Sequence, residues 1–153
     1  MQKWKGLIAL VVLPVLLSLG CKAGSGSEGD RAEIQKILQQ IAADWEEADI
    51  AAFLAKSSAD FRFFTLDGRS LNRGQAQEFL QPMFQRWWDR HMKMEDVDIF
   101  TGRTFGWARY RATFSFMAPA GKTELKHLVT VIFRRDGGRG WRMVQFHMSA
   151  KPL

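Results

Sequence analysis

The spacing of apolar residues changes near His91, and this change constrains the fold more than any other feature of the sequence. Before it, apolar residues recur every three or four positions, which predicts amphipathic helices. After it they alternate with polar residues, which predicts strands that bury one face. Three turn-rich segments, TGRTFG, APAGK and DGGRG, divide this second part. We therefore expect four strands there, at about 93–100, 104–117, 123–135 and 140–149.

The helical part begins near Asp30, which is expected to cap the first helix, with Glu33 completing a capping box. The apolar positions of this helix share one face at three- and four-residue steps: Ile34, Ile37, Leu38, Ile41, Trp45 and Ala48. A short helix at about 50–56 and a strand at 61–66 (FRFFTL) are expected to follow.

A third helix is predicted from Gly74 to His91, with a broad apolar face that includes Trp87 and Trp88. Pro82 lies inside this segment, so we expect a kink or two abutting helices there. Three helices followed by antiparallel strands predict an α+β domain, in which the helices pack on one face of a curved sheet.

The first twenty residues are predicted to be a secretory signal peptide. Lys3 and Lys5 form a basic start, and the run from Gly6 to Gly20 is uncharged and mostly aliphatic. This run is shorter than the ~20 residues that a membrane-spanning helix needs, and Pro14 interrupts it.

The segment LLSLGC that closes this leader resembles a bacterial lipoprotein signal. The resemblance implies cleavage before Cys21, acylation of Cys21, and a membrane anchor followed by a flexible tether over 21–29. It also implies an outer-membrane location, on the periplasmic side, in a Gram-negative cell, because Lys22 replaces the usual aspartate retention signal. The alternative is ordinary secretion with a free thiol, since Cys21 is the only cysteine.

The charge of the chain argues against a nucleic-acid partner and does not identify any other kind of partner. The full chain has a net charge of +6, and a leader with two lysines and no acid would leave about +4 on the mature protein. The sequence has no run of five or more arginines or lysines and no nucleic-acid-binding motif, whereas such a partner predicts a basic stripe with a recognisable motif. Weak attraction to an anionic membrane surface explains the charge equally well.

Three segments resemble parts of one known superfamily: ADWEEADIAAFL (43–54), SSADFRFFTLDGRSLNRGQAQEFL (57–80) and HLVTVIFRRDGGRGWRMVQFHMS (127–149). Their order is similar to that of the nuclear transport factor 2-like superfamily, in particular its SnoaL-like and ketosteroid-isomerase-like branch. The resemblance covers a single domain, 30–153, and implies a cone in which a strongly bent sheet wraps around a long helix and leaves a pocket at the open end. Members include enzymes, ligand-binding proteins and assembly modules, so the fold alone gives no activity.

The catalytic groups of ketosteroid isomerase are not expected here. The resemblance places Thr65 at the position of the proton-abstracting aspartate and Ile41 at that of the oxyanion-binding tyrosine. Neither side chain can perform the corresponding step. We therefore predict that the domain lacks ketosteroid isomerase chemistry.

His147 lies on the last predicted strand, and strict alternation would put it on the same face as Trp141 and Met143. Three roles remain open: a structural hydrogen bond, a ligand contact, or a catalytic base. We predict these pocket residues: Ile41, Trp45, Phe63, Thr65, Trp88 and His147. We expect no cofactor, and the three histidines show no metal-binding spacing.

The combined prediction is a membrane-anchored lipoprotein that acts as a small-molecule-binding or assembly module. Its ligand would be small and apolar, because the chain carries twelve Phe and six Trp. The alternative is an enzyme of the SnoaL-like type, an isomerase, cyclase or hydrolase, that uses His147. Family members commonly dimerise through the outer face of the sheet, so a homodimer is also expected.

Overall fold

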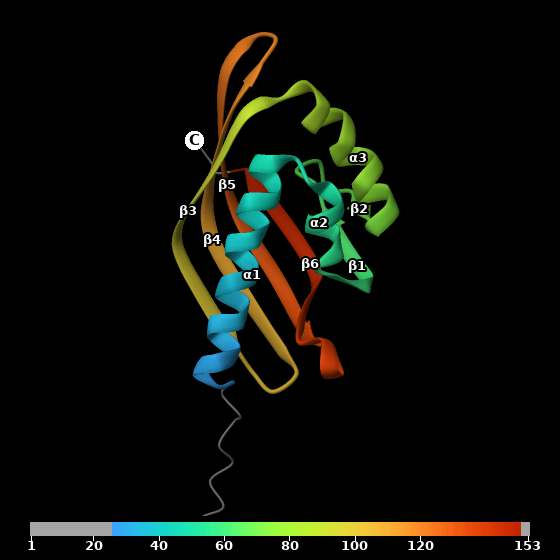
Figure 1. Ribbon diagram of the computed structural model, residues 1–153, viewed down its shortest axis with the longest axis vertical. Helices are drawn as coiled ribbons and strands as arrows, with labels where there is room; N and C mark the ends of the chain where they lie inside the picture. Colours follow the sequence, from blue (N-terminus) through green and yellow to red (C-terminus); the bar gives the residue numbers. More distant parts are fainter. Residues whose placement is uncertain (1–25, 151–153) are drawn as a thin grey trace, which may run out of the picture.

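The computed structural model describes residues 26–150, so the predicted leader and the acylation of Cys21 lie outside the described residues. The fold is α+β, as predicted, with three helices packed inside a curved six-stranded sheet (Figure 1). Its elements are α1 (Glu28–Glu47), α2 (Ile50–Ala55), β1 (Ser57–Phe64), β2 (Ser70–Leu71), α3 (Arg73–Arg86), β3 (Trp88–Thr101), β4 (Phe105–Ala118), β5 (Gly121–Arg135), a 3₁₀ turn (Gly137–Arg139) and β6 (Trp141–Ala150).

The sheet has the strand order β2-β1-β6-β5-β4-β3. Strands β3 to β6 pair antiparallel with their chain neighbours, as expected for strands joined by short turns. β1 pairs parallel with β6, which the long connection through β2, α3 and strands β3 to β5 allows. This pairing brings the first strand beside the last and leaves α1 to cover the inner face.

Helix α1 begins two residues before the predicted cap. Ser27 is the N-cap: its hydroxyl accepts from the backbone N–H of Asp30, and the Asp30 carboxylate accepts from the backbone N–H of Ser27. Glu33 instead accepts from the backbone N–H of Trp141 at 2.9 Å. The backbone N–H of Gly26 donates to the Thr101 carbonyl at 2.6 Å. Residues 26–29, which we predicted as tether, therefore belong to the folded domain.

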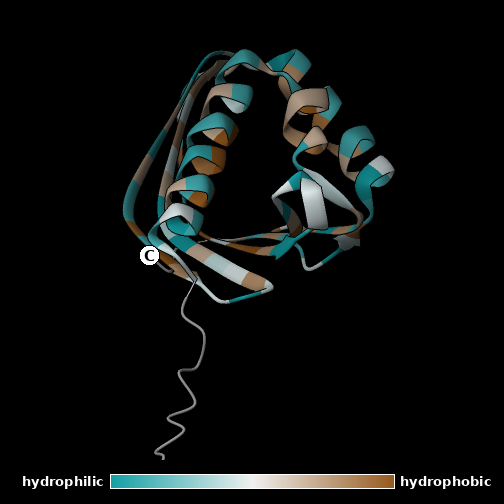
Figure 2. Cartoon of the chain, turned by 60° about the horizontal axis from the view of Figure 1, so that its bottom comes forward, coloured by the Kyte–Doolittle hydropathy of each residue, from teal (hydrophilic) through white to brown (hydrophobic). Residues whose placement is uncertain are grey.

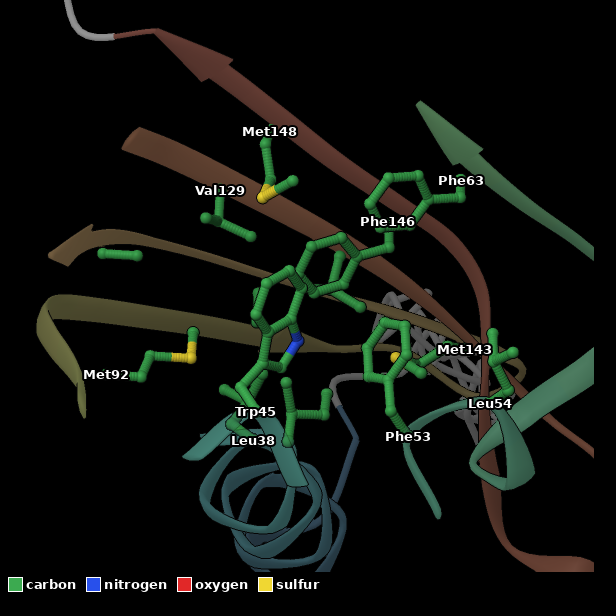
Figure 3. Close-up of a cluster of buried hydrophobic side chains, with 14 of the residues drawn as sticks. Leu38, Trp45, Phe53, Leu54, Phe63, Met92, Val129, Met143, Phe146 and Met148 are labelled. Atoms are coloured by element: carbon green, nitrogen blue, oxygen red, sulfur yellow. The ribbon is translucent and has the colours of Figure 1, made fainter. Parts of the chain in front are cut away.

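The apolar stripe of α1 forms the centre of the core. Its buried members are Ile34, Leu38, Ile41 and Trp45, which confirms the predicted helical face. Figure 2 shows the hydrophobic side of this helix turned toward the inside of the curled sheet. Figure 3 shows Leu38 and Trp45 projecting from the helix toward β6, the strand that carries Phe146 and Met148.

An ion pair near the C-terminal end of α1 holds α1 and α2 together. The buried carboxylate of Asp44 pairs with the ammonium of Lys56, which also donates to the Ala52 carbonyl at 3.0 Å. Ala48 ends α1 in the left-handed region (φ 60°), so that Asp49 can cap α2 by accepting from the Ala52 N–H. The turn between the helices is thus fixed by local hydrogen bonds.

The third helix ends at Arg86, five residues earlier than predicted. Trp87 is extended, and the following residues already pair with β4, starting at Trp88 opposite Met117. Pro82 lies inside α3, and the helix continues through it without the predicted break. The apolar pattern did not mark this boundary, because Trp87 and Trp88 continue it across the junction.

Bulges bend the sheet around α1. β3 changes register against β4 twice, and Asp89 (φ 48°) and Asp96 (φ 53°) adopt left-handed backbone conformations at these points. β6 has a third bulge, because Ile132 pairs with Gln145 whereas Phe133 pairs with Met143. Each bulge adds a residue to one strand and raises the local twist, which lets long strands curl over the helix.

The close approach of α1 to β4 gives a prediction about Gly106. A Cβ at this position would lie 2.9 Å from Ile34 Cδ1 and 2.9 Å from the Phe100 carbonyl oxygen. We expect Gly106→Ala to lower the free energy of unfolding by about 1–3 kcal/mol, because the helix or the strand must move. Urea unfolding followed by circular dichroism measures this change.

Gly138→Ala is the matched control, because a Cβ at Gly138 meets no atom within 4 Å. Its free energy of unfolding should stay within about 0.5 kcal/mol of the unaltered protein. Equal stability of the two variants would contradict the packing described for α1.

Candidate functional site

A cavity of about 380 Å³ lies between the end of α1, helix α3 and the inner face of the sheet. Its lining is mostly apolar and comes from six parts of the chain: Trp45, Thr65, Leu66, Asp67, Arg69, Phe79, Met83, Trp87, Phe114, Leu125, His127 and Met148. A pocket of this size with a few polar groups is typical of a small-molecule site.

Trp45 forms the deepest aromatic contacts of the cavity wall. Its indole packs edge-on against Phe84 of α3, with ring centroids 4.8 Å apart, and against Phe53 of α2 at 6.1 Å. It also meets Phe114 of β4 at 5.1 Å. Although Trp45 is only 6% exposed, its indole Nε1 has no hydrogen-bond partner in the described part of the chain.

His127 of β5 is the second cavity residue with an unsatisfied polar atom. It is 7% exposed, its ring lies 5.5 Å from that of Phe114, and its Nδ1 has no partner among residues 26–150. Burial lowers the pKa of the imidazole, and the backbone of Ser149 works in the opposite direction. The side chain is therefore uncharged at neutral pH.

The sequence analysis missed His127, although the strand pattern carried the signal. Val129, Val131 and Phe133 are all buried, so every second residue of this strand faces inward. His127 lies two residues before Val129 and therefore faces inward as well. A histidine two residues before such a series is expected on the buried face. We had interpreted it as a surface or capping residue, because it stands near the start of the predicted strand.

A hydrogen-bonded turn between β1 and β2 forms the polar rim of the cavity. The Thr65 hydroxyl donates to the Asp67 carboxylate and accepts from the Arg69 backbone N–H at 3.1 Å. Arg69 Nε donates to Asp67 at 2.8 Å, and its guanidinium lies 5.0 Å from the centre of the Phe79 ring. The Thr65 hydroxyl and then the charge of Arg69 lower the pKa of Asp67, so this rim carboxylate stays ionised.

The structure brings two of the six predicted pocket residues to the cavity. Trp45 and Thr65 line it. Ile41 and Phe63 are fully buried in the core beside it and do not line it. Trp88 is 51% exposed at the start of β3.

His147 lies on the opposite face of the sheet from the cavity. The bulge in β6 reverses the alternation, so that Trp141 and Met143 point inward before it, whereas Phe146 and Met148 point inward after it. His147 is half-buried and meets the ring of Phe64 at 6.1 Å. Our assumption that it shares a face with Trp141 and Met143 was wrong, because strict alternation ignores this bulge.

Three further features of the described residues bear on chemistry. Tyr110 is buried in the core without a hydrogen-bond partner within 26–150, and burial raises its pKa, so it stays protonated. No group of three His, Cys, Asp or Glu side chains in that range converges as a metal site would require. None of the helices described is both long and apolar enough to span a bilayer.

The sequence was compared with known protein families, and one of them matches the fold described above. A model described as a SnoaL-like domain matches residues 34–152, which is most of the chain and runs from within α1 through β6. The chain belongs to the SnoaL-like domain family. A search of curated proteins found no match.

Solved structures show that the SnoaL-like domain has the nuclear transport factor 2-like fold. A nuclear transport factor 2-like superfamily protein from Salmonella enterica has a TM-score of 0.75 at 15% identity, over 84% of this chain and 95% of that one. A candidate dehydratase of that family from Streptomyces avermitilis has a TM-score of 0.75 at 13% identity, over 84% and 100%. A candidate aromatic ring hydroxylase from Novosphingobium aromaticivorans has a TM-score of 0.73 at 18% identity, over 84% and 93%. At these identities the likeness extends to the fold alone.

The burial of His127 predicts a pH dependence of stability. Because its pKa is lower when folded than the usual 6.5, the unfolded chain binds more protons as the pH falls. Stability should therefore be complete above about pH 6.5 and decrease as the pH falls through and below this value. Urea unfolding at about pH 7.5, 6.5 and 5.5 measures the effect.

His127→Gln should flatten this dependence, because the group that takes up the proton is gone. His91→Gln is the control: His91 is exposed and touches only Asp89 at 3.3 Å, so this variant should keep the slope of the unaltered protein. The same slope in His127→Gln and the unaltered protein would contradict the buried neutral imidazole.

Proposed function

We propose that this SnoaL-like protein is a lipid-anchored module that binds a small, mainly apolar molecule in the cavity between α1, α3 and the sheet. The molecule carries a hydrogen-bonding group on an apolar body. This matches a lining of aromatic, leucine and methionine side chains with few polar atoms.

The observation that carries the proposal is the mostly apolar lining of the cavity, which includes Trp45 and His127, two side chains with a buried nitrogen that has no partner among residues 26–150. A buried polar group without a hydrogen bond costs about 1–3 kcal/mol, so proteins rarely leave one. Trp45 Nε1 can only donate, and His127 Nδ1 donates or accepts according to its tautomer. Because neighbouring atoms cover both nitrogens, a bound molecule would form hydrogen bonds with them, and so remove this cost, only after a small movement of the two rings.

The anchor part of the proposal rests on the sequence of the leader and on Cys21. A short apolar leader followed by a lone cysteine explains why an exported chain would keep a single thiol. A protein with several acyl chains stays on its membrane, whereas one chain binds only marginally. We place the protein in the cell envelope on these grounds.

A catalytic alternative has one specific observation in its favour. His127 is an uncharged imidazole on the cavity wall, which is the state that a general base needs. The original candidate, His147, is on the other face of the sheet. In this alternative a bound molecule would be converted during incubation with the protein, seen as a changed chromatographic retention time or, for hydrolysis, as a changed mass. His127→Gln would abolish that conversion while binding persists.

Filling the cavity tests the binding proposal. We expect residues 22–153, produced without the leader, to bind 1-anilinonaphthalene-8-sulfonate saturably at one site, measured by the increase in dye fluorescence. Leu125 lines the cavity, so Leu125→Trp should weaken this binding at least tenfold, equivalent to about 1.4 kcal/mol.

Leu128→Trp is the control on the same strand, because Leu128 is exposed on the other face and does not line the cavity. Its affinity for the dye should match that of the unaltered protein. Equal weakening by both substitutions, or no saturable binding at all, would disprove a site in this cavity.

Mass spectrometry tests the anchor separately. In a Gram-negative host, the membrane fraction should yield a chain that starts at Cys21 and carries the mass of its acyl groups. Cys21→Ser should keep the leader and lack that mass. A mature chain with an unmodified thiol in the soluble fraction would disprove the anchor and leave the cavity untouched.

A further inference from the structure

An exposed aromatic patch lies at the end of the sheet where α1 begins, which we call the near end. Phe100 and Phe105 flank the turn between β3 and β4 and are 50% and 52% exposed. Phe100 stacks on Trp107 with ring centroids 5.9 Å apart, on the outer face of the sheet. Arg103 is exposed in the turn itself and makes no ion pair with another described residue. We call these four residues the near-end patch.

A shallow apolar groove of about 300 Å³ continues the patch across the outer face. Besides Phe100, Phe105 and Trp107, it is lined by Gly106, Thr130 and Ile132. Few large apolar side chains of the described chain are this exposed: Leu66, Trp88, Phe100, Phe105 and Leu128. Two of these five, Phe100 and Phe105, thus lie on either side of the same turn.

The chain enters the folded domain beside this patch. Gly26 donates to the carbonyl of Thr101, the residue that follows Phe100, and the space beside Gly26 is closed by Thr101. Figure 1 shows the start of α1 and the β3–β4 turn at the same end of the molecule. Cys21 precedes Gly26 by five residues, which span at most about 18 Å even when fully extended.

We propose that the near-end patch docks on the surface of the lipid bilayer to which Cys21 is attached, with Phe100 and Phe105 in the interfacial layer and Arg103 against anionic headgroups. This inference rests on the lipid anchor proposed above. The short connection holds the patch within reach of the bilayer. Aromatic rings and arginine are side chains that favour the membrane interface, where an apolar body meets charged groups.

The two exposed phenylalanines of the patch are too small by themselves for a stable dimer. An aromatic side chain offers about 150–250 Å², so the half-exposed Phe100 and Phe105 present about 200 Å² together. A stable interface needs about 800 Å² from each partner. The outer face beyond the groove is occupied by ion pairs, Arg109 with Asp98 and Arg111 with Asp96, which a second copy would have to desolvate. A bilayer surface needs neither that area nor that desolvation.

This orientation sets the cavity away from the membrane. Trp45 on the cavity wall follows Glu28 by 17 positions along α1, which corresponds to about 25 Å at 1.5 Å per residue. With the near end on the bilayer, the helix points outward and the cavity lies at its far end. The ligand would thus reach the site from the aqueous side.

A fluorescent probe on a single thiol tests the docking. Thr104 is exposed in the turn of the patch, and Ala120 is exposed in the β4–β5 turn at the opposite end (Figure 1). Because Cys21 is the only natural cysteine, Thr104→Cys and Ala120→Cys in the acylated full-length protein each offer one free thiol for an NBD fluorophore. The protein is reconstituted in vesicles of phosphatidylcholine and phosphatidylglycerol that contain a headgroup-labelled nitroxide quencher.

We expect quenching at position 104 at least threefold stronger than at position 120, with blue-shifted emission only at position 104. Adding Phe100→Ser, Arg103→Ser and Phe105→Ser should reduce the quenching at 104 to the level of 120. Adding Trp88→Ser, an equally exposed apolar residue outside the patch, should leave it unchanged. Circular dichroism confirms that each variant is folded.

Each other outcome overturns the inference. Equal quenching at both positions in protein whose acyl mass is confirmed would disprove docking and leave the anchor intact. An unmodified Cys21 would disprove both the anchor and the docking. A Thr104→Cys protein that forms an interchain disulfide in vesicles without probe quenching would assign the patch to a second copy of the chain.

Discussion

The indole of Trp45 is the contact on which the arrangement of the helices depends. It stands at the end of α1 and touches an aromatic ring from each of three other elements: Phe53 of α2, Phe84 of α3 and Phe114 of β4. A large ring in edge-on contacts fixes orientation as well as distance. The same ring forms the wall of the cavity, so the packing that positions α3 over the sheet also leaves the space beneath it.

The sequence predicted those features whose cause is local. The stripe from Ile34 to Trp45 identified α1 and its buried face, because every turn of the helix contributes one core residue. The glycine-rich and proline-containing turns marked the ends of the antiparallel strands, because a turn is also specified by a few neighbouring residues. The predicted end of the third helix was wrong, because β-pairing of Trp88 with Met117 outweighs the helical pattern that Trp87 and Trp88 continue. Long-range pairing of this kind leaves no mark in the period of the sequence.

The candidate site was predictable only in part, for a related physical reason. The prediction that Thr65 and Trp45 line the cavity was possible because each lies in an element whose direction follows from the local sequence. His147 did not, since one extra residue in β6 turns every later side chain to the opposite face. His127 was overlooked although its strand has no irregularity there, and simple alternation from Val129 places it inward. A bulge depends on how two strands pair and cannot be predicted from one strand alone, whereas the alternation of buried and exposed residues can.

The polar groups at the cavity suit recognition better than the proton transfer of ketosteroid isomerase. Asp67 is the one carboxylate among the described residues that line the cavity, and the Thr65 hydroxyl and then the charge of Arg69 lower its pKa, so it is a weak base. A catalytic base of that type needs a pKa near the working pH and a donor facing the developing oxyanion. Ile41, at the position of that donor, is sealed in the core. The nitrogens of Trp45 and His127 are buried and uncharged at neutral pH, which suits the mainly apolar molecule that we propose as the ligand.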